Sequence, residues 1–337
     1  MQGVVCRRPN ELVRAQLPEP TLSEGQAIVR IRRIGVCGTD IHAYRGRQPY
    51  FTYPRILGHE LAGEVVEVGE NPYGIESGDL VTLLPYFSCG KCIACKCGKP
   101  NCCTEVSVFG VHEDGGMREY VSVPVEYVVK AEGLTLDELA TVECFSIGAH
   151  AVRRANLVPG ERVLVIGGGP IGLGVMKFAK LAGADVTAMD INRKRLEFCE
   201  DWAGPNRAVL ASERAIATIR EITNLEFPTA VFDATGNAQS MMSAIGYLAH
   251  GGRLIYVGLV QADITFSDPE FHKRETTLIS SRNATIEDFH HVIHELKGQH
   301  LDASTFITHR ADLKSVVATF DDWTKPESNV VKAMIEA

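Results

Sequence analysis

The sequence predicts an α/β protein with one β-rich domain and a second domain built on a doubly wound parallel sheet. Its 337 residues favour two domains, at about 100–200 residues per domain. Short runs of β-branched residues separated by Pro and Gly fill about the first 130 residues, which is typical of short strands and turns. From about residue 145, strands alternate with helices, and this pattern predicts a parallel sheet covered by helices.

The individual elements follow from local composition. In the first part, we expect strands at 27–36, 64–69 and 78–84. In the second part, we expect a helix over 173–182 and strands at 162–166, 185–190, 230–234 and 253–258. After residue 284, the pattern predicts a helix over 286–296 and strands at 305–308 and 332–336. No internal repeat interrupts this order.

Composition excludes several classes of partner. The 34 Lys and Arg against 42 Asp and Glu give a net charge of −8, which argues against nucleic acid or a membrane surface. The sequence holds no run of 18 uncharged apolar residues, so no transmembrane helix is expected. The first residues lack the apolar segment of a secretory signal. We therefore expect a cytoplasmic protein that acts on a small molecule.

The cysteines point to a metal site. Six of the ten cysteines fall between Cys89 and Cys103. A cluster this local favours a metal over disulfides. Four thiolates on one loop close a tetrahedral zinc shell, which makes a structural site. We choose Cys103 as the fourth ligand because Gly98 and Asn101 suit the turn before it, although Cys97 and Cys102 leave the ligand set ambiguous. The predicted ligands are Cys89, Cys92, Cys95 and Cys103. The alternatives are a set of free thiols and a zinc-ribbon module for nucleic acid, which the charge disfavours.

A glycine motif predicts a dinucleotide site. Gly167-x-Gly169-x-x-Gly172 follows a predicted strand and opens a predicted helix, and Asp190 ends the next strand. Glycines let the backbone approach a pyrophosphate, and the helix N-terminus supplies amide donors. A carboxylate at Asp190 accepts hydrogen bonds from ribose hydroxyls and repels a 2′-phosphate, so NAD is favoured over NADP. Arg193 and Arg195 weaken this preference, and the alternative is a glycine turn in an ordinary α/β sheet.

Three further segments are dispersed and are not linked by spacing. They are Cys37-Gly38-Thr39-Asp40-Ile41-His42, Gly58-His59-Glu60 and Thr141-Val142-Glu143-Cys144. A single His or Cys is more often structural than functional. By these residues alone, no site would be assigned to them.

Taken together with the cysteine loop and the glycine motif, these segments resemble those of a known enzyme family. The run Gly35–His42, then Pro54–Glu60, the four-cysteine loop and the glycine motif occur in one order, and they resemble the zinc-dependent medium-chain alcohol dehydrogenases. Glu143 stands where the polyol and threonine dehydrogenase branch of that family carries glutamate, so the chain is similar to sorbitol dehydrogenase and its relatives. The stretch from Tyr44 to Glu60 looks most like bacterial sugar-acid dehydrogenases of the L-gulonate and L-galactonate 5-dehydrogenase type.

The resemblance implies the domain plan and the cofactors. It implies a GroES-like β-barrel catalytic domain at 1–147, to which 285–337 return, and a Rossmann domain at 148–284. The active site is expected in a cleft between the two domains. Two Zn²⁺ per chain, one catalytic and one structural, and NAD are the implied cofactors. A homo-oligomer, dimer or tetramer, is the implied assembly.

The resemblance also assigns roles by position. The catalytic zinc is held by Cys37, His59 and Glu60, with Glu143 or water in the fourth place, although Glu60 is alternatively a residue that orients the ligands. Thr39 accepts the proton of the substrate hydroxyl and passes it through the nicotinamide ribose to His42 and solvent. With strand ends added, the expected cofactor-binding residues are Gly167, Gly169, Pro170, Ile171, Gly172, Asp190, Arg195, Thr235, Gly258 and Val260.

The expected reaction is NAD-dependent oxidation of a secondary alcohol on a sugar acid. The alternatives are a polyol or threonine-type substrate, or a zinc- and NAD-binding protein without catalysis. A sugar acid needs a cation for its carboxylate, and the candidates for substrate binding are Arg47, Arg55, Arg282 and Asn283. The histidines at 290, 291 and 294 are predicted to be surface residues rather than a third metal site.

Overall fold

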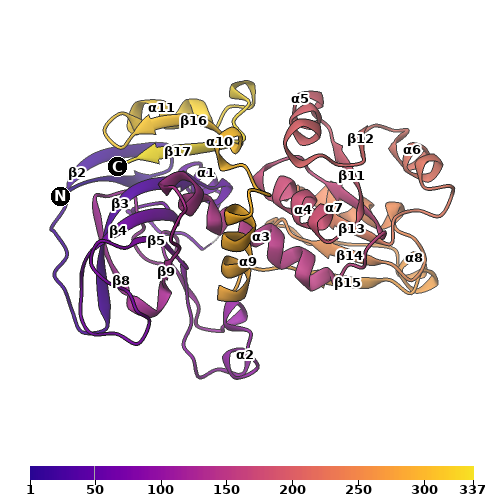
Figure 1. Cartoon of the computed structure of the whole chain (residues 1–337). Coiled ribbons are helices and arrows are strands. Elements are labelled where there is room, and N and C mark those ends of the chain that lie inside the picture. Colours follow the sequence, from indigo (N-terminus) through magenta and orange to yellow (C-terminus); the bar gives the residue numbers. More distant parts are fainter. Residues whose placement is uncertain (49) are drawn as a thin grey trace. The chain divides into compact units, whose positions relative to one another are not determined.

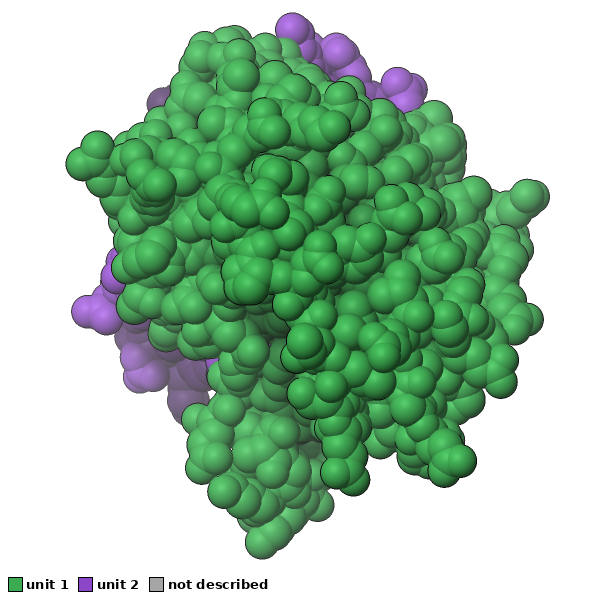
Figure 2. Space-filling view, turned by 90° about the vertical axis from the view of Figure 1, so that its left-hand side faces the viewer, with its two compact units in different colours: residues 1–143, 285–337 green, residues 144–284 purple. Residues whose placement is uncertain are grey.

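The computed structural model describes residues 1–48 and 50–337. The chain forms two compact units, one of Met1–Glu143 with Thr285–Ala337 and one of Cys144–Ala284. Figure 2 colours them green and purple. Pro49, in the stretch that carried the sugar-acid resemblance, lies outside the described residues.

The first unit is built on a seven-stranded sheet. Its strands, in spatial order, are β16 (Ile307–Asp312), β17 (Lys332–Glu336), β3 (Gln26–Val36), β4 (Glu60–Val68), β5 (Leu80–Leu83) and β9 (Val128–Lys130), and β8 (Tyr120–Pro124) also pairs with β3. Two short sheets accompany it, β1 (Gln2–Arg8) with β2 (Glu11–Gln16) and β6 (Tyr86–Phe87) with β7 (Ser107–Val108). Because β17 pairs antiparallel with β3, the C-terminal segment lies beside the N-terminal strands (Figure 1).

Few helices complete the first unit. They are α1 (Gly38–Tyr44), α2 (Ile93–Lys96), α9 (Ile286–Lys297), α10 (Ala303–Phe306) and α11 (Val316–Trp323). Residues buried to 7% exposure or less, among them Ile31, Leu61 and Phe320, form one apolar core between the sheet and α11. The long helix α3 (Leu136–Ala155) contains the residue at which the first unit ends.

The second unit is the predicted doubly wound sheet. Its six parallel strands, in spatial order, are β12 (Arg207–Leu210), β11 (Asp185–Asp190), β10 (Arg162–Ile166), β13 (Ala230–Asp233), β14 (Arg253–Tyr256) and β15 (Thr277–Ser280). The helices between them are α4 (Pro170–Leu181), α5 (Arg193–Phe198), α6 (Ala215–Ile222), α7 (Ala238–Ser243) and α8 (Asp268–Lys273). The strand order reverses between β10 and β13, where such sheets bind ligands at their carboxyl ends.

One predicted strand is partly wrong. The strand expected at 305–308 begins only at Ile307, because Thr305 and Phe306 belong to α10. The Asp302 carboxylate accepts hydrogen bonds from the backbone N–H groups of Ser304, at 2.9 Å, and Thr305, at 3.3 Å. This cap favours one helical turn over the β-branched preference of Thr305. No helix among the described residues is long and apolar enough to cross a membrane.

The start of α3 is fastened by a charged contact that yields a stability prediction. The Asp137 carboxylate accepts from Arg33 Nε, on β3, at 2.8 Å and from Arg310 Nη2, on β16, at 2.5 Å. Burial raises the pKa of Asp137, but the two arginines outweigh burial and lower it overall. A carboxyl with a lowered pKa stabilises the fold above its unfolded pKa, and this contribution is lost as pH falls through the folded pKa.

We therefore expect Asp137→Asn to lower the free energy of unfolding by about 1–2 kcal/mol at pH 7. The difference from the native chain should begin to shrink as pH falls below about 4, where the unfolded carboxyl protonates, and should vanish below the lower pKa of the folded carboxyl. Urea unfolding of both proteins at several pH values measures it. A difference that does not depend on pH would show that the ionised carboxylate is not the cause.

Candidate active site and metal centres

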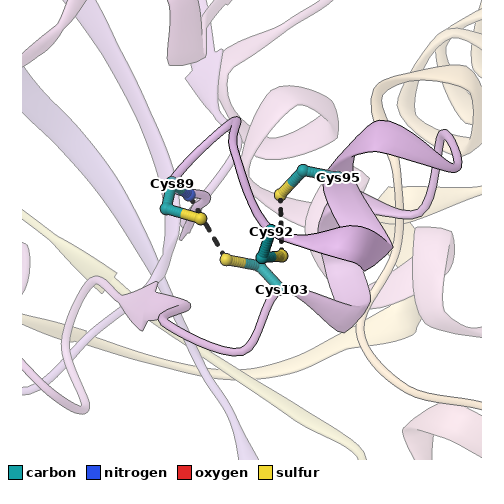
Figure 3. Close-up of side chains that lie close together, drawn as sticks. All are labelled: Cys89, Cys92, Cys95 and Cys103. Atoms are coloured by element: carbon teal, nitrogen blue, oxygen red, sulfur yellow. Dashed lines mark hydrogen bonds between the residues drawn. The ribbon is translucent and has the colours of Figure 1, made fainter.

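Four cysteines gather at the loop that contains α2. Cys89 follows β6, Cys92 is the N-cap of α2, Cys95 lies within α2 and Cys103 follows the short helix at 100–102. Their four sulfur atoms all lie within 4.8 Å of one another, and the side chains point toward a common centre (Figure 3). A tetrahedral zinc with Zn–S near 2.3 Å places its sulfurs about 3.8 Å apart, so the four thiols fit such an ion. Cys97 and Cys102 are exposed and lie outside this group.

The backbone around this loop favours thiolates. Cys103 Sγ accepts hydrogen bonds from the N–H groups of Cys89 and Glu105, each at 3.3 Å. N–H groups of Cys95 and then Thr104 lower the pKa of Cys92 to about 5. Burial and the neighbouring thiols raise the pKa of Cys95 to about 11, because several negatively charged sulfurs at this distance repel one another. A divalent cation removes this conflict, so the donor set fits structural zinc.

A second group joins Cys37, His59 and Glu60, which are dispersed in sequence. Cys37 is the N-cap of α1, directly after β3, and Glu60 opens β4 with His59 just before it. Antiparallel pairing of β3 and β4 places Gly35 opposite Glu60 and so brings the two segments together. One possible ligand atom from each of the three residues lies within 4.8 Å of the others.

The Asp40 carboxylate contacts the segments that carry Cys37 and His59. Asp40 is fully buried, and its carboxylate accepts from the N–H groups of Cys37, at 2.9 Å, and Gly58, at 3.1 Å. Its Oδ1 lies 3.8 Å from His59 Nδ1, a buried atom that has no hydrogen-bond partner among the described residues. Gly58 has φ +94°, which side chains rarely adopt, so glycine lets the chain turn here toward His59. A histidine that faces a carboxylate through one ring nitrogen is typical of metal ligands.

The electrostatics of this group favour a cation. Burial lowers the pKa of His59, but Asp40 and Cys37 outweigh it and raise that pKa well above its ordinary value. The surroundings therefore stabilise positive charge at the imidazole. A metal cation bound by Cys37 and His59 would be stabilised by the same negative groups, so the residues fit a catalytic zinc.

Glu143 lies near this group on α3 and is 3% exposed. Tyr86, on β6, donates its hydroxyl to Glu143 Oε1. Burial raises the pKa of Glu143, while the charge of His59 and the Tyr86 hydrogen bond act in the opposite direction. Glu143 is not part of this group. Its carboxylate therefore lies more than 4.8 Å from the ligand atom of at least one of Cys37, His59 and Glu60.

Thr39 and His42 lie on α1, beside Cys37. Their i, i+3 spacing places them next to each other on one face of that helix. Thr39 is half-buried and His42 is exposed. Although the residue as a whole is exposed, partial desolvation of its ring and then the charge of Arg47 lower the pKa of His42, which favours the neutral imidazole.

The glycine loop of the second unit is tightly built. Gly167 has φ +103°, and Gly169 is the N-cap of α4, with Pro170 and Ile171 opening the helix. A Cβ at Gly172 would lie 1.8 Å from the carbonyl oxygen of Gly167. Only glycine at this position lets the first turn of α4 pack on the end of β10, so that N–H groups of that first turn can face a phosphate.

Asp190 lies at the end of β11 and supports the same loop. Its Oδ2 accepts from Gly168 N–H at 2.6 Å, and its Oδ1 accepts from Asn192 N–H at 2.7 Å. Arg195, on α5, comes close to the loop, since a Cβ at Gly169 would lie 3.8 Å from Arg195 Nη1. This places a carboxylate and a guanidinium beside the glycine loop, where the adenosine half of a dinucleotide binds.

Two further strand ends meet beside the loop. Asp233, at the end of β13, accepts from Thr235 N–H at 2.9 Å and from its hydroxyl at 2.6 Å. A Cβ at Gly258 would lie 2.4 Å from Gly236 N, so the turns after β13 and β14 touch through backbone. Val260 is half-buried two residues further on. The predicted cofactor residues therefore gather at the carboxyl ends of β10, β11, β13 and β14.

Comparisons with known proteins agree with this geometry. Residues 23–133 match the alcohol dehydrogenase GroES-like domain, and residues 170–298 match the zinc-binding dehydrogenase domain. The L-galactonate-5-dehydrogenase of Escherichia coli K12 is 41% identical over 99% of this chain and 98% of its own. The chain belongs to the zinc-type alcohol dehydrogenases.

Two other relatives of this alcohol dehydrogenase are informative. The sorbitol dehydrogenase of Bacillus subtilis is 32% identical over 77% of this chain and 75% of its own. A crystal structure of an Escherichia coli CFT073 alcohol dehydrogenase with NADH superposes with a TM-score of 0.92, at 30% identity over 100% of this chain and 99% of the other. The resemblance to the family and the GroES-like and Rossmann folds are confirmed, and the chain is an oxidoreductase.

The candidate substrate residues of this alcohol dehydrogenase lie in both units. Arg47 is exposed, after α1, and its N–H donates to His42 O at 2.7 Å. Arg55 donates to Thr52 Oγ1 at 2.8 Å and lies 3.7 Å from Asp114. Arg282 is exposed and Asn283 is half-buried with φ 53°, just after β15 of the second unit. The histidines at 290, 291 and 294 are absent from every metal-competent group among the described residues.

Sequence reasoning assigns no role to three residues that surround the group of Cys37, His59 and Glu60. Asp40 was quoted in its motif without a role, although an acid three residues after an N-cap is a helix-start signal. Tyr86 gave no signal. Lys332 is 1% exposed and contacts Glu60, and its only signal is a charge next to the apolar run Ala333–Ile335.

Proposed function

We propose that this enzyme oxidises a secondary hydroxyl of a sugar acid of the L-galactonate or L-gulonate type, with NAD as hydride acceptor, in the cytoplasm. The single observation that carries the proposal is the full-length match, at 41% identity, to an L-galactonate-5-dehydrogenase. The cysteine–histidine–glutamate cluster and the glycine loop supply the chemistry that such a reaction needs. A loop of cysteine thiols rather than disulfides suits a reducing compartment.

The catalytic metal is proposed to be held by Cys37 and His59, with Glu60 or Glu143 and an exchangeable position completing the set. Zinc, when bound, supplies Lewis acidity that makes a neighbouring alcohol hydroxyl easier to deprotonate. Asp40 orients His59, and Tyr86 holds Glu143 by its hydroxyl hydrogen bond. The second zinc of each chain is proposed at Cys89, Cys92, Cys95 and Cys103, where its role is structural.

Thr39 and His42 are proposed to carry the proton of the substrate hydroxyl to solvent. Thr39 is half-buried beside Cys37, and its hydroxyl accepts one proton as it donates another. His42 lies one turn along α1 and is exposed, so it exchanges protons with water. Its lowered pKa favours the neutral imidazole, which is the form that accepts a proton.

The second unit is proposed to bind NAD through the ten residues predicted from sequence. NAD, when bound, accepts the hydride. Asp190 favours ribose hydroxyls over a 2′-phosphate because its carboxylate repels a second anion. Its position beside Gly168, 2.6 Å from oxygen to nitrogen, supports this role. Arg195 contributes to the same end of the cofactor.

The substrate carboxylate is proposed to meet a guanidinium. Arg47 is the favoured candidate, because it lies on the same segment as His42 and no described acidic side chain pairs with it in the structure. Arg55 is engaged by Thr52 and Asp114, and it supports the loop before His59. Arg282 and Asn283 remain candidates on the other unit.

Substrate choice is tested with a panel. We expect NAD reduction at 340 nm with L-galactonate or L-gulonate, and at least tenfold lower kcat/KM with sorbitol, xylitol and L-threonine. A zinc chelator should abolish the activity. Faster turnover of sorbitol or xylitol would replace the sugar acid by a polyol and keep the zinc chemistry. Activity that survives complete zinc removal would contradict the metal assignment.

A homo-oligomer, dimer or tetramer, is also proposed. Its support is β15, the edge strand of the six-stranded sheet, on which Leu278 is 41% exposed. Exposed edges of this kind are usually covered. Light scattering should give a multiple of the 36.8 kDa chain mass. A monomeric mass at micromolar concentration would contradict it.

A further inference from the structure

Lys332 is a lysine with almost no access to water. Its side chain is 1% exposed, and its Nζ lies 2.7 Å from both carboxylate oxygens of Glu60, which is itself fully buried. The same Nζ donates to Val36 O at 3.1 Å. A buried ammonium with these partners is fixed in position, because moving it away would leave an unpaired charge in the core.

Three adjacent strands build this contact. Lys332 opens β17, Val36 ends β3 and Glu60 opens β4. The pairing places Gly35 opposite Glu60, and a Cβ at Gly35 would lie 2.1 Å from Glu60 Oε2. The glycine therefore leaves the space that the carboxylate occupies, and the sheet register determines where that carboxylate lies.

The same carboxylate also faces the metal cluster. A Glu60 oxygen lies within 4.8 Å of the ligand atoms of Cys37 and His59. The Glu60 carboxylate would therefore be shared between the Lys332 ammonium and a metal ion held by Cys37 and His59. Each cation weakens the hold of the other on the carboxylate, because an oxygen that is hydrogen-bonded to an ammonium is a poorer donor to a metal.

Glu143 differs in this respect. The partner that donates to its Oε1 is the Tyr86 hydroxyl, which carries no charge. The Lys332 ammonium also acts on Glu143 through its charge, but its hydrogen bonds, at 2.7 Å, are with the two oxygens of Glu60.

We propose that Lys332 is a positioning residue that competes with the zinc ion for Glu60 and keeps this carboxylate a weak, displaceable ligand, so that one position at the metal stays available to the substrate hydroxyl. The inference rests on the proposed function in one respect, that Cys37 and His59 hold zinc. It assigns a role to a residue far from them in sequence.

The test compares Lys332→Met, Lys332→Arg, Glu60→Gln and the double variant E60Q/K332M with the native, zinc-loaded enzyme. The first readout is the rate at which each zinc equivalent passes to a coloured chelator. The second is the visible spectrum after cobalt(II) replaces zinc, which reports the ligands directly. The third is the division of any kinetic effect between KM and kcat.

We expect K332M to release one zinc equivalent at least tenfold more slowly, to change the cobalt spectrum and to raise KM for the alcohol more than it lowers kcat. K332R keeps the charge and should stay within threefold of the native enzyme. E60Q alone should release zinc within threefold of the native rate. In the E60Q background, K332M should add less than a threefold change.

Two results would overturn the inference. One is a folded K332M that releases zinc at the native rate or faster. The other is a tenfold effect of K332M that persists without Glu60, since Lys332 would then act on the fold and not through the carboxylate. If K332M does not fold, the zinc-release rate of E60Q tests the inference. Tenfold faster release from E60Q would show that Glu60 is a firm zinc ligand and would overturn it. A native enzyme that holds no zinc at Cys37 would instead defeat the proposed function.

Discussion

Cys37→Ser should lower kcat/KM by at least about a thousandfold, or about 4 kcal/mol of transition-state stabilisation, while the protein still binds NADH. Cys37 is the cysteine of the cluster with His59 and Glu60. A serine hydroxyl is not ionised near pH 7 and is a poor zinc ligand, so we expect the proposed catalytic metal to be lost. The glycine loop and Asp190 belong to the other unit and keep their own contacts.

Three measurements on one preparation check this result. Steady-state kinetics give kcat/KM, NADH fluorescence gives the dissociation constant, and metal analysis should fall by one zinc per chain. Cys97→Ser is the matched control, because Cys97 is an exposed thiol outside both metal-competent groups. Turnover of C37S at the native rate would show that Cys37 holds no catalytic metal.

Gly172→Ala should weaken NADH binding at least tenfold and destabilise the second unit by about 1–3 kcal/mol. The added Cβ would lie 1.8 Å from Gly167 O and 2.9 Å from Gly167 C, and both of these are backbone atoms. Backbone cannot rotate aside as a flexible side chain does, so the loop must move. That movement displaces the N–H groups that a phosphate needs.

Gly174→Ala is the matched control for this prediction. Gly174 lies in the same helix, but the nearest atom to an added Cβ, Gly148 Cα, is 3.7 Å away, an ordinary contact. Thermal unfolding and NADH titration of the two variants separate loop geometry from a general effect of alanine in α4. Equal NADH affinity in both variants would contradict the proposed close packing of the loop.

Local chemistry is readable without a structure. The strand before the glycine motif, the motif itself, its helix and the acid at the end of the next strand lie within 29 residues, from Arg162 to Asp190, and each constrains its neighbours directly. The cysteine loop is also compact, and the sulfurs of the four predicted ligands lie within 4.8 Å of one another, while Cys97 and Cys102 are not in this group. The strand expected at 305–308 was partly wrong because the capping carboxylate of Asp302 outweighed β-propensity.

The sequence by itself therefore determined the fold class, the family resemblance and the segments that carry the candidate ligands. The resemblance was needed to link Cys37 with His59 and Glu60, because spacing alone does not link them. Their distances, and the partners of each carboxylate, were decided only by the tertiary structure. Lys332 meets Glu60 across 272 residues, and Tyr86 meets Glu143 across 57. Such contacts depend on strand register and burial, which involve the whole domain, and no local pattern of residues encodes them.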